Sequence, residues 1–284
     1  MKVLLTGGRG MLGRTLCKEL TDFDVIPTDL PEADITDESG LHALIRRHAP
    51  DAVIHCAAMT AVDKCETERD LAFRLNAVGS ANVAAACFRN HVRLIAISTD
   101  YVFSGDAPRP YHEFDLPTGG RTVYGQSKFA GEEMIRCHCP DHVIVRLAWL
   151  YGAGGPSFVH TMLKLADDPQ RELKVVCDQR GNPTSTLAVA RGLRAILKRQ
   201  KLVGTFHMTC EGEASWHEFA CEIFRQMGIS RTIIPCTTAE FPRPAPRPEN
   251  SRLEKRMLRL CSLPPMPDWK EALAEFLESE FKHR

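Results

Sequence analysis

Short apolar runs alternate with amphipathic stretches through the first half of the chain. The runs short enough to be buried strands lie at 3–5, 24–29, 52–55, 93–98 and 143–146. The stretches with apolar residues at helical spacing lie at about 11–20, 39–48, 63–89 and 123–137. Such alternation is typical of a parallel sheet with helices on both faces. We therefore expect an α/β chain with a Rossmann-like, doubly wound parallel sheet that binds ligands at the carboxyl ends of its strands.

The second half of the chain is less regular and predicts a smaller α/β lobe. Helical spacing recurs at 158–166, 187–198 and 215–227 and again from Trp269, and 205–208 is typical of a strand. Ser215 followed by Glu218 indicates a capping box. The proline-rich segment 241–248 cannot be regular structure, and it is either a linker or an ordered binding loop. The main domain is assigned to 1–150 and about 182–204, and the lobe to about 151–181 and 205–284.

Composition narrows the class of protein. The 36 basic and 36 acidic side chains cancel, so nothing favours a nucleic-acid partner. No apolar run has the length to span a bilayer, and the first residues do not resemble a signal peptide, so we expect no membrane contact and a cytoplasmic protein. The eleven cysteines form no paired framework, and Cys137-His138-Cys139 offers too few ligands for zinc. We expect no metal site and reduced, mostly buried thiols.

Three glycines after the first strand have the spacing of a phosphate-binding loop. Gly7, Gly10 and Gly13 lie between a predicted strand and a predicted helix. In such a loop one glycine makes a tight turn, one lets backbone N–H groups approach a pyrophosphate, and one lets the helix pack closely on the sheet. The helix N-terminus attracts the phosphate through its partial positive charge. The pattern predicts a dinucleotide site.

Two side chains bear on which nicotinamide cofactor binds. Asp29 ends the second strand, where an acid commonly binds the adenosine ribose hydroxyls and favours NADH. Arg9 in the glycine loop favours NADPH, because a cation there can bind a ribose phosphate. The choice between NADPH and NADH therefore stays open. Asp34, followed by Ile35, either flanks the adenine or caps a helix.

A candidate catalytic group follows the fourth predicted strand. Thr99 lies at its carboxyl end, and Tyr124 and Lys128 are four residues apart, hence on one face of a helix. Free tyrosine titrates near about pH 10, and we expect the neighbouring ammonium to lower the pKa of Tyr124. Tyr124 would then donate a proton to a carbonyl oxygen as hydride reaches its carbon. Thr99 would position that oxygen, and Lys128 would also hold the nicotinamide ribose.

These motifs resemble the extended short-chain dehydrogenase/reductases and, within them, the dTDP-4-dehydrorhamnose reductase family. The matching segments are the glycine loop, 57–63, 98–103, 124–128, 149–152, 178–184 and 247–253. The resemblance covers nearly the whole chain. It implies reduction of the 4-keto group of dTDP-4-dehydro-L-rhamnose to dTDP-L-rhamnose. It also implies that the main domain binds the dinucleotide and that the lobe binds the sugar nucleotide.

The resemblance further implies which residues form each subsite. The expected cofactor contacts are Gly7, Gly10, Met11, Leu12, Gly13, Asp29, Asp34, Ile35, Ala58, Met59, Thr60, Tyr124 and Lys128. The expected substrate contacts are Thr99, Asp100, Trp149 and Arg247. The Arg247 guanidinium suits a substrate phosphate, and flanking prolines would hold it in place. Trp149 either stacks on substrate or fills the junction between domains, and Asn76 either supports the active site or packs as an ordinary helical residue.

Departures from the family and other functions also follow from the sequence. Gly119-Gly120-Arg121-Thr122 stands where relatives commonly carry Pro-Leu-Asn, so the loop that enters the catalytic helix is expected to differ. Some family members dimerise around magnesium held by glutamates, and the matching regions lack such acids, so we expect no magnesium and either a monomer or a homodimer. The alternatives are another nucleotide-sugar reductase or epimerase on the same scaffold and a non-catalytic NADP-binding regulatory subunit.

Overall fold

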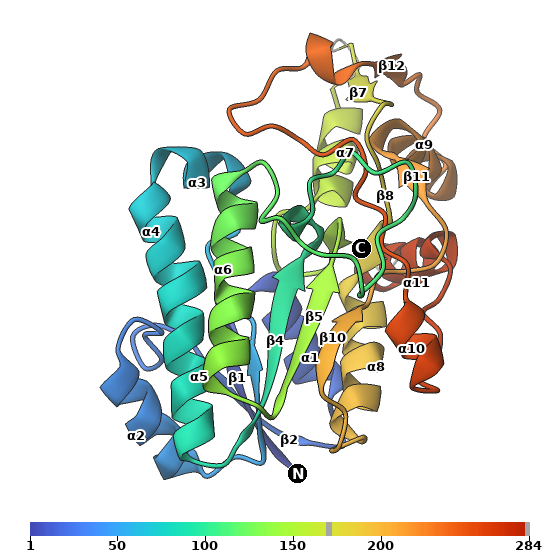
Figure 1. Cartoon of the computed structure of the whole chain (residues 1–284). Coiled ribbons are helices and arrows are strands. Elements are labelled where there is room, and N and C mark those ends of the chain that lie inside the picture. The colour runs from blue at the N-terminus through green and yellow to red at the C-terminus, as the bar shows by residue number, and fades with distance from the viewer. Residues whose placement is uncertain (169–171, 282–284) are drawn as a thin grey trace.

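The computed structural model describes residues 1–168 and 172–281. Its centre is a six-stranded sheet in the order β10-β5-β4-β3-β1-β2, with every neighbouring pair parallel (Figure 1). The strands are β1 (Lys2–Thr6), β2 (Asp24–Thr28), β3 (Ala52–His55), β4 (Arg93–Thr99), β5 (His142–Leu147) and β10 (Gly204–His207). The direction of winding reverses between β1 and β3, which opens a crevice at their carboxyl ends. The Rossmann-like, doubly wound sheet is confirmed.

Helices cover both faces of this sheet (Figure 1). One face carries α1 (Met11–Glu19) and α8 (Thr186–Leu197), and the other carries α2 (Glu38–His48), α5 (Gly79–Arg89) and α6 (Val123–His138). Successive strand side chains point to opposite faces. Val3 and Leu5 of β1 therefore belong to the core under α1 and α8, whereas Leu4 belongs to the core under α2 and α5.

The predicted helical stretch 63–89 is a series of shorter helices. It comprises α3 (Val62–Thr67), α4 (Arg69–Phe73), a π-helical turn at Arg74–Val78, and α5. By length and composition alone, Arg69–Arg89 qualifies as a membrane-crossing helix, so the expectation that no apolar run has that length is wrong. Half of its most apolar window is buried inside the fold, which is typical of a core helix.

The second half forms short two-stranded sheets and further helices. The strands are β6 (Leu150–Tyr151), β7 (Lys174–Val176), β8 (Arg180–Gly181), β9 (Thr184–Ser185), β11 (Ala214–Ser215) and β12 (Ile234–Cys236). The helices are α7 (Phe158–Ala166), α9 (Trp216–Met227), α10 (Arg256–Leu260) and α11 (Trp269–Phe281). Two 3-10 turns, η2 (Asp100–Val102) and η3 (Thr238–Glu240), complete the described elements. The predicted capping box is present, since Ser215 Oγ accepts the Glu218 N–H at 3.0 Å and a Glu218 oxygen accepts the Ser215 N–H at 2.6 Å.

Two expectations about this half and about the cysteines need correction. Strand β10 pairs with β5 at the edge of the main sheet, so residues 205–207, which were assigned to the smaller lobe, belong to the main sheet. All eleven cysteines are free, but only five of them are buried. The exposed ones are Cys17, Cys137, Cys177 and Cys221. The expectation of mostly buried thiols is therefore wrong, because several of these residues lie on the outward faces of helices and loops.

Candidate active site

The glycine loop joins β1 to α1 as its spacing predicts. Gly7 has φ +72°, a left-handed conformation that favours glycine, and its carbonyl oxygen accepts the Gly10 N–H at 3.0 Å. A Cβ on Gly13 would lie 2.3 Å from that same oxygen, so a side chain there would push α1 away from the loop. Gly10 is the N-cap of α1. The first-turn N–H groups, which have no acceptor within the helix, are therefore available for a phosphate.

A cavity of about 410 Å³, here called the cofactor cavity, opens at the carboxyl ends of β1 and β3. The predicted cofactor residues that line it are Gly7, Gly10, Met11, Leu12, Gly13, Asp29, Asp34, Ile35, Ala58 and Thr60. The predicted cofactor contacts Met59, Tyr124 and Lys128 do not line it. The side chain of Asn76 accepts the Met59 N–H at 2.8 Å and donates to the Met59 carbonyl at 3.0 Å. Met59 is thus the residue through which Asn76 anchors this wall of the cavity.

Asn76 supports the site from the π-helical turn. It is buried, and its Nδ2 also donates to the hydroxyl of Ser127 on α6 at 2.9 Å. One amide side chain thereby ties the cofactor cavity wall at Met59 to the helix that carries Tyr124 and Lys128. Of the two interpretations of Asn76, support of the active site is the one that these bonds favour. A π-helical turn is a frequent feature of functional sites, because it re-aims side chains within a continuous helix.

The acid at the end of β2 has backbone partners in the glycine loop. Asp29 accepts hydrogen bonds from the N–H groups of Arg9 at 3.0 Å and Leu30 at 2.9 Å. Arg9 and Asp29 also line a second cavity of about 600 Å³ beside the loop, together with Arg14 and Lys18. Asp29, which favours NADH, and Arg9, which favours NADPH, therefore both line this second cavity.

Asp34 has a local role in the turn before α2. Its carboxylate accepts the N–H of Thr36 at 2.8 Å and the Thr36 hydroxyl at 2.7 Å, and these bonds lower the pKa of Asp34. The cap of α2 is Asp37, which accepts the Gly40 N–H at 3.0 Å. The interpretation of Asp34 as a helix cap is therefore wrong, while Asp34 does line the cofactor cavity.

Helix α6 brings Tyr124 and Lys128 to Thr99. Thr122 caps the helix by accepting the Gly125 N–H at 3.0 Å, and both catalytic candidates are buried. The side chain of Thr99 lies beside the Tyr124 hydroxyl and lowers the pKa of the phenol. Lys128 Nζ donates at 2.8 Å to the carbonyl oxygen of Ile97, a residue that lines the cofactor cavity. The three predicted catalytic residues therefore meet at the carboxyl end of β4.

The pKa of Tyr124 is shifted in the opposite direction from the prediction. Burial raises the pKa of the Tyr124 phenol, and this effect outweighs the interaction with the Thr99 side chain, which lowers the pKa. Burial also lowers the pKa of Lys128 to about 8. The expectation that Lys128 makes the phenol more acidic is wrong in this structure, because desolvation dominates both groups. A raised pKa keeps Tyr124 protonated at neutral pH, which is the form a proton donor needs.

Asp100 is buried beside Thr99 and lines neither large cavity. Its Oδ1 accepts the Thr99 hydroxyl at 2.9 Å, and its Oδ2 is buried without a hydrogen bond within the described residues. Burial raises the pKa of Asp100 to about 6, although a bond with Ser251 opposes the shift. In this structure Asp100 therefore contacts Thr99 and does not face the space that a ligand would fill.

A larger cavity of about 760 Å³, here called the substrate cavity, lies between Tyr101 and the second half of the chain. Among the described residues its walls include the cations Lys174, Arg243 and Arg247 and the acid Glu172, so it suits an anionic ligand. Tyr101 packs edge-on against Tyr124, with ring centroids 5.4 Å apart. Tyr101 lines the substrate cavity and contacts Tyr124, whereas Tyr124 itself lines neither cavity.

Two predicted substrate residues line this cavity. Trp149, with φ +48°, stacks on Trp216 at a centroid distance of 3.6 Å and an angle of 9°, and Phe158 packs on the same stack. Trp149 therefore joins the two parts of the chain and also presents a cavity wall, so neither of its two interpretations excludes the other. Arg247 lines the cavity while one of its nitrogens is bound to Asp63.

Sequence reasoning missed residues that the fold brings to the site. Trp216, Phe158 and Asp63 were assigned no role. Trp216 stacks on Trp149 and Asp63 binds Arg247, while Phe158 packs on Trp216 and lines the substrate cavity. Asp63 does lie inside the matched segment 57–63, which is the signal that pointed towards it. Trp216 follows the helix-capping Ser215 and has no distinguishing pattern, since its position depends on how α9 packs against the main domain.

The fold and the site together define the class of protein to which this chain belongs. A glycine loop on a parallel sheet, a Thr99–Tyr124–Lys128 group and two flanking cavities are the features of a nicotinamide-dependent oxidoreductase of the short-chain type. The profile of the family described as RmlD substrate binding domain matches residues 1–281. This chain belongs to that family.

Named relatives are similar in sequence to this chain over nearly its full length. A dTDP-4-dehydrorhamnose reductase of Streptomyces griseus is 42% identical over 96% of this chain and 91% of its own. The spore coat polysaccharide biosynthesis protein SpsK of Bacillus subtilis (strain 168) is 39% identical over 98% and 97%. The crystal structure of a dTDP-4-dehydrorhamnose reductase of Bacillus anthracis in complex with NADP has a TM-score of 0.94 at 40% identity, covering 98% of this chain and 99% of that one.

Proposed function

We propose that this chain reduces the 4-keto group of dTDP-4-dehydro-L-rhamnose to give dTDP-L-rhamnose, with NADPH or NADH as the hydride donor. The observation that carries the proposal is the group at the carboxyl end of β4. Tyr124 is buried there beside Thr99 and packs on Tyr101 of the cationic substrate cavity, and Lys128 is bound to Ile97 of the cofactor cavity. The family membership and the named relatives support the same activity.

Each residue of the site has its own role in the proposed reduction. The reduced nicotinamide supplies hydride when it is bound. Tyr124 donates its proton to the carbonyl oxygen, and Thr99 holds that oxygen and the phenol in line through its hydroxyl. Lys128, fixed to the Ile97 carbonyl, holds a positive charge beside the cofactor cavity and would contact the nicotinamide ribose. Asp100 orients Thr99, and Trp149 and Arg247 contact the sugar nucleotide.

A second candidate substrate has a specific observation in its favour. A relative from Streptomyces antibioticus that is 40% identical over 97% of this chain is named a probable dTDP-4,6-dihydroxy-2-methyloxan-3-one 4-ketoreductase. The same catalytic group serves either ketone, because it acts on the carbonyl oxygen and not on the rest of the ring. The choice between the two substrates depends on the walls of the substrate cavity. For the location and assembly of the chain we propose a cytoplasmic enzyme that is a monomer or a homodimer.

A direct assay separates these possibilities. The protein is mixed with each dTDP-linked 4-keto sugar and with NADPH or NADH, and the absorbance of the reduced nicotinamide is followed. Stoichiometric loss of absorbance with a reduced sugar product is expected. An interconversion of sugars without net loss of reduced nicotinamide would indicate an epimerase, and no reaction with any sugar, together with a stoichiometric enzyme partner, would indicate a regulatory subunit.

A further inference from the structure

Asp63 holds the proline-rich segment 241–248 over the substrate cavity. Its Oδ2 accepts a hydrogen bond from Arg247 Nη2 at 2.9 Å, and its Oδ1 accepts the Ala245 N–H at 3.2 Å. Arg247 Nη1 in turn donates to the Ala245 carbonyl at 3.0 Å. Figure 1 shows this segment, in orange after β12, reaching back across the molecule towards α3. One carboxylate on the first turn of α3 thus binds both the backbone and the side chain of the segment.

The segment has few other means of attachment. Pro242, Pro244 and Pro246 have no backbone N–H, so they cannot donate hydrogen bonds to neighbouring elements. From Pro248 onwards the chain is held differently, since Asn250 N–H donates to Gly105 O at 2.9 Å and Asn250 Nδ2 donates to Ala107 O at 2.8 Å. The contact with Asp63 is therefore the main polar anchor of the part that carries Arg247.

Helix α3 also contacts the cofactor side and the catalytic helix. It begins two residues after Thr60, which lines the cofactor cavity. A second acid on α3, Glu66, accepts the N–H of Val123 at 2.9 Å, and Val123 immediately precedes Tyr124. The same short helix therefore binds the start of the catalytic helix through Glu66 and the substrate-cavity segment through Asp63.

Arg247 keeps donors for a ligand while it is bound to Asp63. Its guanidinium has five N–H donors. Among the described residues, one N–H is bound to Asp63 and another to the Ala245 carbonyl. Arg247 lines the substrate cavity beside Tyr101, and the side chain of Arg247 is only 21% exposed. A half-buried guanidinium that is fixed on one edge is pre-organised to bind an anion with the other.

We infer that Asp63 is a positioning residue that fixes Arg247 to bind the diphosphate of the nucleotide sugar. The inference rests on the proposed function, because it assigns the anionic part of that substrate to Arg247. Asp63 does not touch the reacting atoms. Its loss should therefore weaken nucleotide binding and leave the proton and hydride transfers of bound substrate nearly unchanged.

The test compares variants by binding and by kinetics. In Asp63→Asn and Asp63→Ala, the KM for the 4-keto sugar nucleotide and the calorimetric Kd for thymidine diphosphate should each rise about tenfold, the loss expected for one charge-assisted contact. The kcat should stay within about twofold, and the Kd for NADPH should not change, which also shows that the variants are folded. Glu68→Gln, an exposed acid next to α3 that pairs with Lys64, is the matched control and should behave like the parent protein.

A double-mutant cycle separates positioning from simple loss of charge. If Asp63 acts through Arg247, then Asp63→Ala added to Arg247→Met should cost little beyond Arg247→Met alone. Fully additive losses, an unchanged Kd for thymidine diphosphate in both Asp63 variants, or a fall in kcat with constant KM would each overturn the inference. Calorimetry needs no turnover, so an inactive parent protein would count against the proposed function alone, whereas a parent protein that does not bind thymidine diphosphate would count against this inference.

Discussion

The proposed carbonyl reduction depends on the phenol of Tyr124 as its proton donor. This phenol is buried, protonated and lies beside Thr99, so its removal should leave the binding sites intact but remove the proton donor. We predict that Tyr124→Phe lowers kcat by about a hundredfold or more while the Kd for NADPH changes little. Tyr151→Phe is a suitable control, because the Tyr151 hydroxyl is buried and has no hydrogen-bond partner within the described residues. Full activity in the Tyr124 variant would show that another group is the acid.

Lys128 should impose a pH limit on the reaction. Burial lowers its pKa to about 8, so the ammonium is present below that pH and is lost as the pH rises through it. We predict that kcat is constant near neutral pH and declines above about pH 8. We also predict that Lys128→Ala lowers both kcat and the affinity for NADPH. The measurements are a pH–rate profile and a cofactor titration, with the exposed Lys198→Ala as control. Unchanged cofactor affinity in Lys128→Ala would rule out its contact with the cofactor.

Arg9 should set the preference between the two cofactors. Its guanidinium lines the second cavity beside Asp29, where the carboxylate already accepts two backbone N–H groups. A ribose phosphate gains a positive partner there, whereas a ribose hydroxyl does not need one. We predict that Arg9→Ala weakens NADPH binding about tenfold and leaves NADH binding nearly unchanged. Equal losses for both cofactors, measured by fluorescence titration, would place the Arg9 side chain away from the ribose phosphate.

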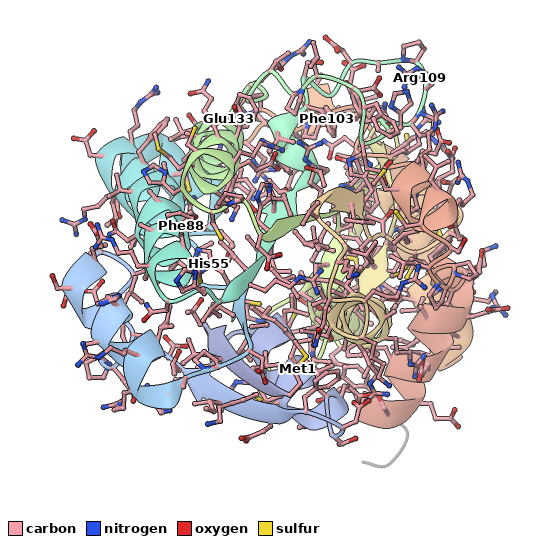
Figure 2. All side chains as sticks on the ribbon, turned by 60° about the horizontal axis from the view of Figure 1, so that its bottom comes forward. Met1, His55, Phe88, Phe103, Arg109 and Glu133 are labelled. Atoms are coloured by element: carbon pink, nitrogen blue, oxygen red, sulfur yellow. The ribbon has the colours of Figure 1, made fainter. Side chains whose placement is uncertain are left out.

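At the scale of elements, the close packing of α6 on the π-helical turn decides the site geometry. A Cβ on Gly131 would lie 2.2 Å from the backbone oxygen of Asn76, which cannot move without disturbing Met59. We predict that Gly131→Ala destabilises the protein by about 1–3 kcal/mol and lowers kcat, since overpacking shifts α6 relative to β4. Thermal unfolding and kinetics test this, with Glu133→Ala on the exposed side of α6 as control (Figure 2).

The helices and strands themselves followed from local pattern. Apolar runs of strand length and leucines at helical spacing predicted β1 to β5 and α1, α2, α6, α7, α8 and α9 at nearly their observed bounds. The π-helical turn at Arg74–Val78 was not predictable, because its extra residue per turn depends on the packing of Asn76 between Met59 and Ser127. The pairing of β10 with β5 was likewise missed, since a four-residue strand carries no sign of which sheet it joins.

For the whole molecule, two buried neutral histidines should make stability depend on pH. Burial lowers the pKa of His55 and of His207 to about 3, whereas both titrate near about 6.5 when unfolded. The unfolded chain therefore binds more protons between these values, so stability is full above about pH 6.5 and falls as the pH drops. Each histidine should cost about 2 kcal/mol at pH 5. The buried Glu132, whose pKa Arg146 lowers, adds to the loss, and Asp100 opposes it in part.

Chemical denaturation at several pH values measures this effect. His55 lies inside the fold (Figure 2), where its two ring nitrogens are hydrogen-bonded to Thr6 at 2.8 Å and Ser80 at 3.2 Å. His207 Nδ1 is hydrogen-bonded to the Glu254 carbonyl at 3.1 Å, a bond that a glutamine amide can also donate, so His207→Gln is the variant to test. It should show a smaller loss of unfolding free energy between pH 7 and pH 5 than the parent protein, whereas the exposed His138→Gln should not differ from it. A free energy of unfolding that is constant over this range would contradict the neutral burial of both histidines.

The sequence by itself determined the features that depend on neighbours along the chain. The glycine spacing, the Tyr124–Lys128 face of one helix and the capping box are local, so residue order was sufficient to predict them. Only the tertiary structure decided the direction of the Tyr124 pKa shift, the engagement of Arg247 by Asp63 and the stacking of Trp149 on Trp216. Each of these depends on burial or on contact between segments far apart in the chain, and the free energies of desolvation and packing arise only when those segments meet.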